Sequence, residues 1–256
     1  MQHYFSLAGR TALVTGGSRG IGRMIAQGYL EAGARVIICC RKIAEGQQTA
    51  EQLSQYGECT ALAADLSTEQ GARQLAEDVQ AITDRLDILV NNAGTSWGAP
   101  LEEFPVSGWE KVMQLNVISV FSCIQQLLPL LRSSASAENP ARIINIGSVA
   151  GISSFGEQAY SYGPSKAAVH QLSRNLAREL VSEQINVNVI APGRFQSKMT
   201  SHIHSDPDAM AEDCKHIPMK RWGREEEMSA LAIMLAGTGG AYMTGNIIPI
   251  DGGFTL

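Results

Sequence analysis

The regular alternation of short apolar segments with longer helical ones constrains the fold most. Most of the short segments are continuously apolar, as parallel strands buried on both faces must be. They are Thr11–Thr15, Arg35–Cys39, Thr60–Ala63, Ile88–Asn91, Arg142–Ile146, Asn186–Ile190 and Ile247–Ile250. Helical stretches between them include Ile21–Ala32, Gly71–Ile82, Trp109–Leu131 and Ser165–Val181. Right-handed crossovers then predict an α/β Rossmann fold: a doubly wound, parallel, seven-stranded sheet with helices on both faces.

No internal repeat or linker interrupts this pattern, so residues 1–256 are predicted to form a single domain. The least regular segment, residues 194–225, is polar and has clustered His and Met residues. We expect it to form a substrate lid, because it follows the carboxyl end of a strand, where open α/β sheets bind ligands. The alternative is a pair of short surface helices without functional motion.

Composition and charge exclude several functions. The net charge of -5 argues against nucleic-acid binding, which needs clustered Lys and Arg. The start has no signal-peptide pattern, and the apolar stretch Val112–Leu131 is broken by polar residues and Pro129. We therefore expect a cytoplasmic protein with no membrane span. Five cysteines without paired spacing fit reduced thiols that fill the core. His202 and His204 have no third ligand nearby, so no metal is predicted.

A glycine-rich turn joins the first predicted strand to the first helix. Glycines at this place allow a tight turn and let backbone N–H groups approach a pyrophosphate at the helix N-terminus. The alternative is a glycine turn without a ligand. A dinucleotide site is favoured, with contacts from Gly16, Ser18, Arg19, Gly20, Ile21 and Gly22.

The residues after the second strand indicate which dinucleotide binds. A carboxylate there would accept hydrogen bonds from a ribose 2′-hydroxyl, but the chain has Arg41 and Lys42, with no acid before Glu45. Arg19 can approach a 2′-phosphate from the glycine turn. Two guanidinium groups around a dianion predict NADP(H), unless both are only solvated surface charges.

The order and spacing of six motifs resemble the short-chain dehydrogenase/reductase family from end to end. They are Thr15-Gly16-x-x-x-Gly20-x-Gly22, Asn91-Asn92-Ala93-Gly94, Asn116, Ser148, Tyr162-x-x-x-Lys166 and Pro192-Gly193. The resemblance implies a catalytic set of Asn116, Ser148, Tyr162 and Lys166. It also implies cofactor contacts from Asp65, Leu66, Asn92, Ala93, Gly94, Tyr162, Lys166, Pro192, Gly193 and Ser197. Asp65 or Ser67 would alternatively cap the next helix.

Tyr162 and Lys166 are four residues apart in a helical segment and therefore share a face. A free tyrosine has a pKa near 10, and we expect the Lys166 ammonium to favour its phenolate. Pro164 between them requires the first turn of the helix. Tyr160 lies off this face. Without the other motifs, Tyr162 would be interpreted as a packing aromatic.

The other catalytic candidates are polar residues in unusual places. Ser148 lies beyond a strand and would orient a substrate carbonyl, unless it is only a turn serine. Asn116 interrupts an apolar helix. By resemblance it distorts that helix and holds a water that relays protons to Lys166, and a purely structural hydrogen bond is the alternative. Ser148 and Tyr162 are 14 apart, one more than is usual in the family, so we expect the extra residue in the loop Ile152–Glu157.

Among family members the chain is most similar to 3-oxoacyl-[acyl-carrier-protein] reductases, especially the bacterial type associated with rhamnolipid biosynthesis. This implies reduction of a 3-oxoacyl thioester, carried on acyl carrier protein or coenzyme A, by a homotetramer. Glu183 reduces the expected complementarity to an acidic carrier protein, although Arg174 and Arg178 lie nearby. Other ketones, polyols or steroids remain alternative substrates, and a non-catalytic NADP-binding regulator is a second alternative. Four apolar residues of the lid are expected to line an acyl chain, and the alternative is that they belong to the core. They are Phe195, Met199, Ile203 and Met210.

Overall fold

The computed structural model describes residues 4–154 and 158–256. Its seven strands form one sheet in the order β3-β2-β1-β4-β5-β6-β7. Every neighbouring pair is parallel, which confirms the doubly wound α/β sheet. The strands are β1 (Thr11–Thr15), β2 (Arg35–Cys40), β3 (Cys59–Ala63), β4 (Ile88–Asn91), β5 (Ala141–Ile146), β6 (Ile185–Pro192) and β7 (Ile247–Ile250).

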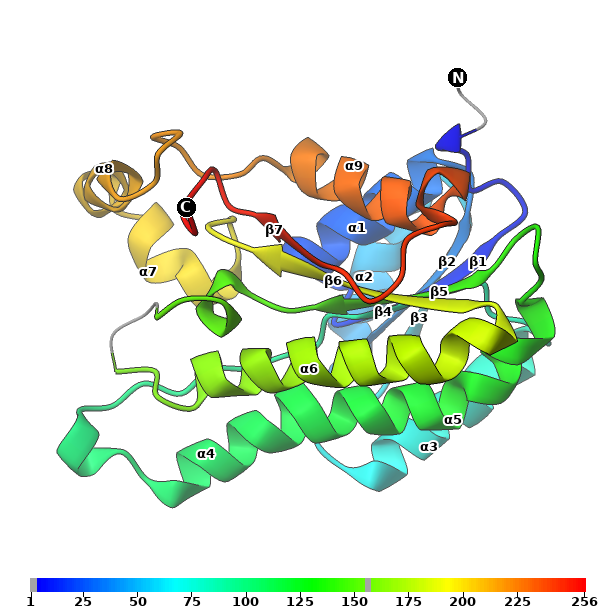
Figure 1. The fold of residues 1–256 in the computed structure, drawn as a ribbon, viewed down its shortest axis with the longest axis horizontal. Helices are drawn as coiled ribbons and strands as arrows, with labels where there is room; N and C mark the ends of the chain where they lie inside the picture. Colours follow the sequence, from blue (N-terminus) through cyan, green and yellow to red (C-terminus); the bar gives the residue numbers. More distant parts are fainter. Residues whose placement is uncertain (1–3, 155–157) are drawn as a thin grey trace.

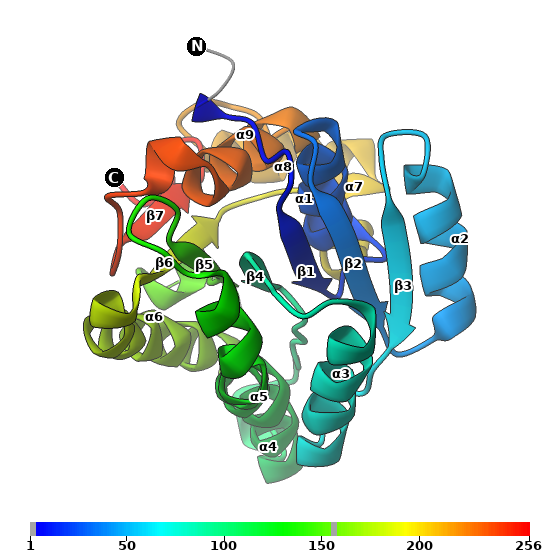
Figure 2. The ribbon, with the colours of Figure 1, turned by 90° about the vertical axis from the view of Figure 1, so that its right-hand side faces the viewer.

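Helices cover both faces of the sheet (Figures 1 and 2). Side chains alternate along each strand, so Val14 enters one apolar core and Leu13 the other. The first core is closed by α1 (Gly20–Glu31), α2 (Ile43–Leu53) and α9 (Glu225–Ala236). The second is closed by α3 (Glu69–Ile82), α5 (Ser119–Ser134) and α6 (Tyr162–Leu180).

The predicted helix Trp109–Leu131 is longer than expected and irregular in the middle. It comprises α4 (Val106–Met113), a π-helical turn (Gln114–Ile118) and α5. Among the described residues, Val106–Ser134 is the one helix long and apolar enough to cross a membrane by length and composition alone. Core helices of water-soluble proteins pass the same test, and this one packs against α3 and α6 in the fold.

The segment 194–225, expected to be irregular, contains the short helices α7 (Ser201–His204) and α8 (Pro207–Lys215). Asp206 caps α8 by accepting hydrogen bonds from the backbone N–H groups of residues 208 and 209, and Pro207 occupies its first turn. The helices of the alternative interpretation are therefore present. Both lie beyond the carboxyl end of the sheet (Figure 1), and lid movement stays a prediction.

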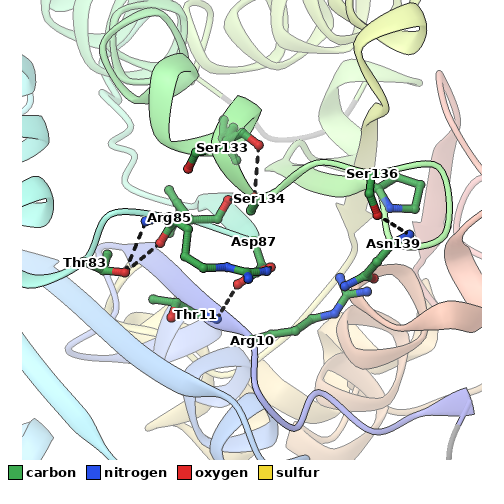
Figure 3. Close-up of polar contacts among 12 residues, drawn as sticks. Arg10, Thr11, Thr83, Arg85, Asp87, Ser133, Ser134, Ser136 and Asn139 are labelled. Atoms are coloured by element: carbon green, nitrogen blue, oxygen red, sulfur yellow. Dashed lines mark hydrogen bonds and ion pairs between the residues drawn. The ribbon is translucent and has the colours of Figure 1, made fainter.

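The opposite, amino-terminal edge of the sheet is fastened by polar contacts (Figure 3). Buried Asp87 accepts a hydrogen bond from the backbone N–H of Thr11, at 2.8 Å, and pairs with Arg85 at 2.7 Å. Two buried arginines donate to carbonyl groups at the end of α9: Arg10 to residue 236, and Arg142 to residues 235 and 237. Positive charge at a helix C-terminus is stabilising. The contacts at the amino-terminal ends of the strands therefore stabilise the fold, and the carboxyl ends are left open for ligand binding.

Candidate active site

The glycine turn after β1 has the tight geometry that the sequence predicts. Gly16 has a φ of +64°, a left-handed conformation that favours glycine. At Gly22 the requirement is space, since a Cβ would lie 2.4 Å from the Asn92 amide nitrogen and 2.5 Å from the Gly16 carbonyl oxygen. Asn92 also donates to the Thr15 carbonyl oxygen at 2.8 Å, so it fastens β4 to the turn.

An open cavity of about 710 Å³ extends over the carboxyl ends of the strands, from the glycine turn to Tyr162 and Lys166. Most of the predicted cofactor contacts line it: Gly16, Ser18, Arg19, Gly20, Ile21, Arg41, Asp65, Leu66, Asn92, Ala93, Gly94, Tyr162, Lys166, Pro192 and Ser197. The predicted Gly22 and Gly193 are not among the lining residues. Gly22 is packed behind the turn, and a Cβ on Gly193 would lie 2.8 Å from the Asp251 Cα.

Sequence reasoning missed part of the lining, including Thr95, Lys111 and Leu115. These residues carry no charge pattern or glycine signal that distinguishes them in a sequence. Lys111 places its ammonium 5.1 Å from the centre of the Trp97 ring, a cation–π contact. Their position in the lining follows only from the path of the chain after β4.

The two arginines predicted to mark an NADP site both border the cavity. Arg19 also forms an ion pair with Glu45 at 3.5 Å, and Glu45 pairs with Lys42 at 3.1 Å. A hydrogen bond and the charge of Lys42 lower the pKa of Glu45. Glu45 lies in the first turn of α2. It is the first acidic residue after Arg41 in the sequence, and in the structure its carboxylate pairs with Arg19.

Asp65 does not cap a helix. Its carboxylate accepts hydrogen bonds from the Ser67 backbone N–H and hydroxyl, at 3.1 and 2.7 Å. The cap of α3 is Thr68, whose hydroxyl accepts from the Gly71 N–H at 3.0 Å. The alternative role of Asp65 or Ser67 as the α3 cap is therefore wrong, because α3 begins at Glu69, directly after Thr68. Asp65 remains free to face the cavity.

Helix α6 begins at Tyr162, so Pro164 lies in its first turn as expected. Lys166 is 5% exposed, and its ammonium donates to the Ile146 carbonyl oxygen at 2.8 Å. The same nitrogen lies 5.7 Å from the centre of the Tyr162 ring. The two side chains expected to act together therefore share one face of α6.

The expected direction of the Tyr162 pKa shift is wrong. Burial raises the pKa of the phenol, and a hydrogen bond with Ser148 opposes this only in part. Burial also lowers the pKa of Lys166 to about 8. Desolvation by the surrounding protein is the largest cause of both shifts. The phenol consequently keeps its proton at neutral pH.

Ser148 follows β5 and is 7% exposed. Its hydroxyl oxygen accepts a hydrogen bond from the Ala150 N–H at 3.1 Å, so it also stabilises the single 3₁₀ turn Val149–Gly151. Ser148 is therefore a turn residue whose hydroxyl also contacts Tyr162, so its role in the turn and its role in orienting a carbonyl do not exclude each other. Part of the loop Ile152–Glu157, where an extra residue was expected, lies outside the described residues.

Asn116 lies in the π-helical turn and is 1% exposed. Its carbonyl oxygen accepts from the Thr95 N–H at 2.8 Å, and its amide donates to the Thr95 carbonyl and the Ser165 hydroxyl. The helix is distorted as expected, and the side chain joins the π-helical turn to α6 and to the segment that follows β4. Its described contacts are structural, and the proton relay stays a prediction.

The apolar residues expected to line an acyl chain divide into two groups. Phe195 is 3% exposed and belongs to the core, packed so closely on Gly223 that a Cβ there would lie 2.3 Å from its ring. Met199 is 46% exposed and lines the cavity. Ile203 and Met210 are half-buried. Among the described residues no group of three or more His, Cys, Asp or Glu side chains is arranged to hold a metal ion.

The class of dinucleotide-binding oxidoreductases is defined by a parallel Rossmann sheet, a glycine turn at the carboxyl ends of its strands, and a cavity lined by Tyr162 and Lys166, with Ser148 hydrogen-bonded to Tyr162 behind the lining. A family profile described as enoyl-(acyl carrier protein) reductase matches residues 16–255. The chain belongs to the short-chain dehydrogenase/reductase family.

Two curated relatives cover nearly all of the chain. A rhamnolipids biosynthesis 3-oxoacyl-[acyl-carrier-protein] reductase of Pseudomonas aeruginosa is 75% identical over 100% of both chains. A 2-dehydro-3-deoxy-D-gluconate 5-dehydrogenase of Dickeya dadantii is 36% identical over 98% of this chain and 97% of its own.

Solved structures give the same result. The Pseudomonas aeruginosa RhlG/NADP active-site complex superposes with a TM-score of 0.98 at 75% identity, covering 100% of both chains. A gluconate 5-dehydrogenase from Burkholderia cenocepacia, in complex with NADP and tartrate, has a TM-score of 0.91 at 30% identity, covering 99% of this chain and 98% of its own. The predicted family and fold are confirmed.

Proposed function

We propose that the protein uses NADPH to reduce a 3-oxoacyl thioester to the 3-hydroxyacyl product. The observation that carries this is full-length identity of 75% to a 3-oxoacyl-[acyl-carrier-protein] reductase, in a chain whose cavity is lined by Tyr162 and Lys166, with Ser148 hydrogen-bonded to Tyr162. The alternative of a non-catalytic NADP-binding regulator is disfavoured because all three side chains are present and grouped.

The cavity fits a nicotinamide dinucleotide. Its glycine turn leaves no room for side chains where a pyrophosphate would lie, and the turn leads into the N-terminus of α1. Arg19 and Arg41 would hold a 2′-phosphate, and Asp65 and Leu66 would contact the adenine. The contacts nearer the nicotinamide would be Asn92, Ala93, Gly94, Pro192, Gly193 and Ser197. When bound, NADPH supplies the hydride.

The chain's own residues supply the proton and the orientation. A phenol whose pKa is raised by burial is protonated at neutral pH, so Tyr162 can donate to the oxygen of a substrate carbonyl. Ser148 hydrogen-bonds and polarises that carbonyl beside Tyr162. Lys166 anchors the nicotinamide ribose and favours the phenolate left after the transfer. Asn116 completes the catalytic set by helping to return the proton through a water.

Surface charge near α6 bears on whether acyl carrier protein or coenzyme A carries the acyl group. Glu183, which weakens complementarity to an acidic carrier protein, forms an ion pair with Arg132, one of whose guanidinium nitrogens donates at 2.9 Å. This pairing lowers the pKa of Glu183 and neutralises its charge locally. Arg174 and Arg178 are exposed on α6 nearby. The surface is therefore more favourable to an acidic carrier than the sequence suggests, and both carriers are included in the test.

We further propose a cytoplasmic homotetramer, in which residues 194–225 close over the substrate. Exposed apolar side chains along α4, the π-helical turn and α5, namely Val106, Trp109, Ile118 and Phe121, support burial of this face against a second subunit. The 36% identity to a sugar-acid dehydrogenase makes ketones of polyols and sugar acids the second candidate substrate class.

The test is NADPH consumption with acetoacetyl-CoA, longer 3-oxoacyl thioesters on coenzyme A and on acyl carrier protein, and simple or sugar-derived ketones. We expect 3-oxoacyl thioesters to give the largest kcat/KM. Tyr162→Phe is expected to abolish turnover while NADPH still quenches tryptophan fluorescence. Turnover of sugar-derived ketones alone would overturn the proposed substrate, and full activity of Tyr162→Phe would overturn the mechanism.

A further inference from the structure

His170 is a buried residue with no part in the chemistry above, and it lies directly behind Ser148. It is 4% exposed, and it follows Lys166 by one helical turn and Tyr162 by two. The same face of α6 therefore presents a phenol, an ammonium and an imidazole in succession. The phenol meets the hydroxyl of Ser148, and the imidazole meets the backbone of the turn that begins there.

The imidazole contacts both ends of that turn. Its Nε2 accepts a hydrogen bond from the Ser148 backbone N–H, at a long 3.4 Å, and the ring also hydrogen-bonds the backbone of Gly151. Burial, with smaller contributions from the charges of Lys166 and Arg174, lowers the pKa of His170 to about 4. The ring is consequently neutral, and a neutral imidazole donates from one nitrogen while it accepts at the other.

Two glycines, Gly147 and Gly151, lie next to the imidazole ring, and neither position has room for a side chain. A Cβ on Gly147 would lie 2.2 Å from His170 Nε2, and a Cβ on Gly151 would lie 2.8 Å from Cε1. The Gly147 N–H donates to the Ile190 carbonyl oxygen at 2.8 Å, which fixes this end of the turn to β6. The ring thus fills a gap between α6 and the Ser148 turn that a residue with a side chain at either glycine would close.

We propose that His170 is a positioning residue, which ties the turn Ser148–Gly151 to α6 and thereby holds the Ser148 hydroxyl beside Tyr162. It does not line the cavity, and it acts through Ser148. The proposal rests on the proposed hydride-transfer function, in which Ser148 orients the carbonyl. A packing role alone would be met by any side chain of similar volume, whereas this role needs an acceptor at the place of Nε2.

Two amide substitutions separate these roles. The amide of His170→Gln can place its oxygen where Nε2 lies, and that of His170→Asn reaches only the place of Nδ1. We expect His170→Leu and His170→Asn to lower kcat by about tenfold to a hundredfold, as small displacements of catalytic groups do. His170→Gln should stay within about threefold of wild type. The exposed neighbour in Gln171→Ala serves as the control. NADPH affinity and melting temperature establish that each variant is folded.

A double-mutant cycle identifies the route of the effect. In a Ser148→Ala background, His170→Leu should lower residual kcat by less than about twofold, because the side chain that it positions is gone. Equal losses in both backgrounds, or equal activity of the Asn and Gln variants, would overturn the proposal. Failure of the wild-type protein to reduce any carbonyl compound would instead count against the proposed function, so the two failures are distinguishable.

Discussion

At the scale of single residues, the cofactor end of the cavity combines opposite charges. Glu45 holds Arg19 in an ion pair, so a bound 2′-phosphate would compete with a carboxylate for that guanidinium. Exposed ion pairs of this kind are worth little, and a dianion is the stronger partner. Arg41 borders the same cavity and is available to complete a bidentate site.

Arg41→Asp is the direct test of this arrangement. A carboxylate would repel the 2′-phosphate and accept hydrogen bonds from a ribose 2′-hydroxyl, so we expect kcat/KM with NADPH to fall about a hundredfold, and NADH to become the preferred cofactor. Steady-state kinetics with both cofactors measures this, and Arg73→Asp, at an exposed position of α3, is the control. An unchanged preference would mean that Arg41 is only a surface charge.

Lys166 is kept in the active site at a cost to stability. Its folded pKa is about 8 against the usual 10.5. Below about pH 8 the ammonium is charged in both states, so the cost of burying it is fully present. Between pH 8 and pH 10.5 the unfolded chain binds more protons than the folded one. The free energy of unfolding therefore rises with pH as the folded lysine loses its charge.

Lys166→Met should therefore abolish turnover yet raise the free energy of unfolding at pH 7 by about 1–3 kcal/mol. This advantage should shrink as the pH rises from 8 toward 10.5, where the wild-type lysine is neutral. Urea denaturation across that range measures it, with exposed Lys198→Met as the control. A difference from wild type that does not change with pH would contradict a lowered Lys166 pKa.

At the scale of elements, one amide interrupts a long helix. The π-helical turn Gln114–Ile118 brings the Asn116 side chain to Thr95 and Ser165, which lie on separate segments. A hydrophobic residue of the same size would leave the N–H and C=O of Thr95 buried without their partner. Unsatisfied buried groups of this kind each cost about 1–3 kcal/mol.

We expect Asn116→Leu to lower the free energy of unfolding by about 2–4 kcal/mol and to lower kcat. Chemical denaturation and NADPH-dependent turnover measure the two effects. Exposed Asn175→Leu on α6 controls for the loss of an amide at the surface. Normal stability with lost turnover would instead indicate that Asn116 acts only in proton relay.

Which elements the sequence predicts depends on how local their signals are. The strands are predicted well, because a continuously apolar segment such as Ile88–Asn91 has few alternatives in an α/β chain. The π turn is not, since it depends on contacts with Thr95 and Ser165 that are distant in sequence. Helix α8 was expected only in the alternative interpretation of residues 194–225, although Asp206 and Pro207 are recognisable start signals, because the polar composition around them suggested a loop.

The candidate site divides in the same way. The positions of Tyr162, Lys166 and the glycine turn follow from spacing, and the structure brings them to one cavity. The direction of the Tyr162 pKa does not follow, because it is set by burial from several elements. Neither the ion pair between Arg132 and Glu183 nor the contact between His170 and Ser148 has a sequence signal, as each joins segments whose distance only the fold determines.

At the scale of the whole molecule, exposed apolar side chains on α4 and α5 favour association. Phe121 is 44% exposed and Ile118 is 50% exposed on the same helical segment. We expect the protein to be a tetramer by light scattering, and Phe121→Asp to produce smaller species with normal secondary structure. The exposed Glu110→Asp on α4 is a control that keeps the charge. A monomeric mass for the wild-type protein would contradict this assembly.

The fastening of the sheet at its amino-terminal edge bears on how new specificity can arise. Asp87, Arg10 and Arg142 secure the strands and α9 far from the cavity, where no ligand contact constrains them. Segments at the carboxyl ends of the strands, above all α7 and α8, can then differ between related enzymes without removing the contacts that stabilise the sheet. A directed-evolution library confined to the exposed positions of α7 and α8 should therefore keep a high fraction of folded clones while its members diverge in the ketones they accept.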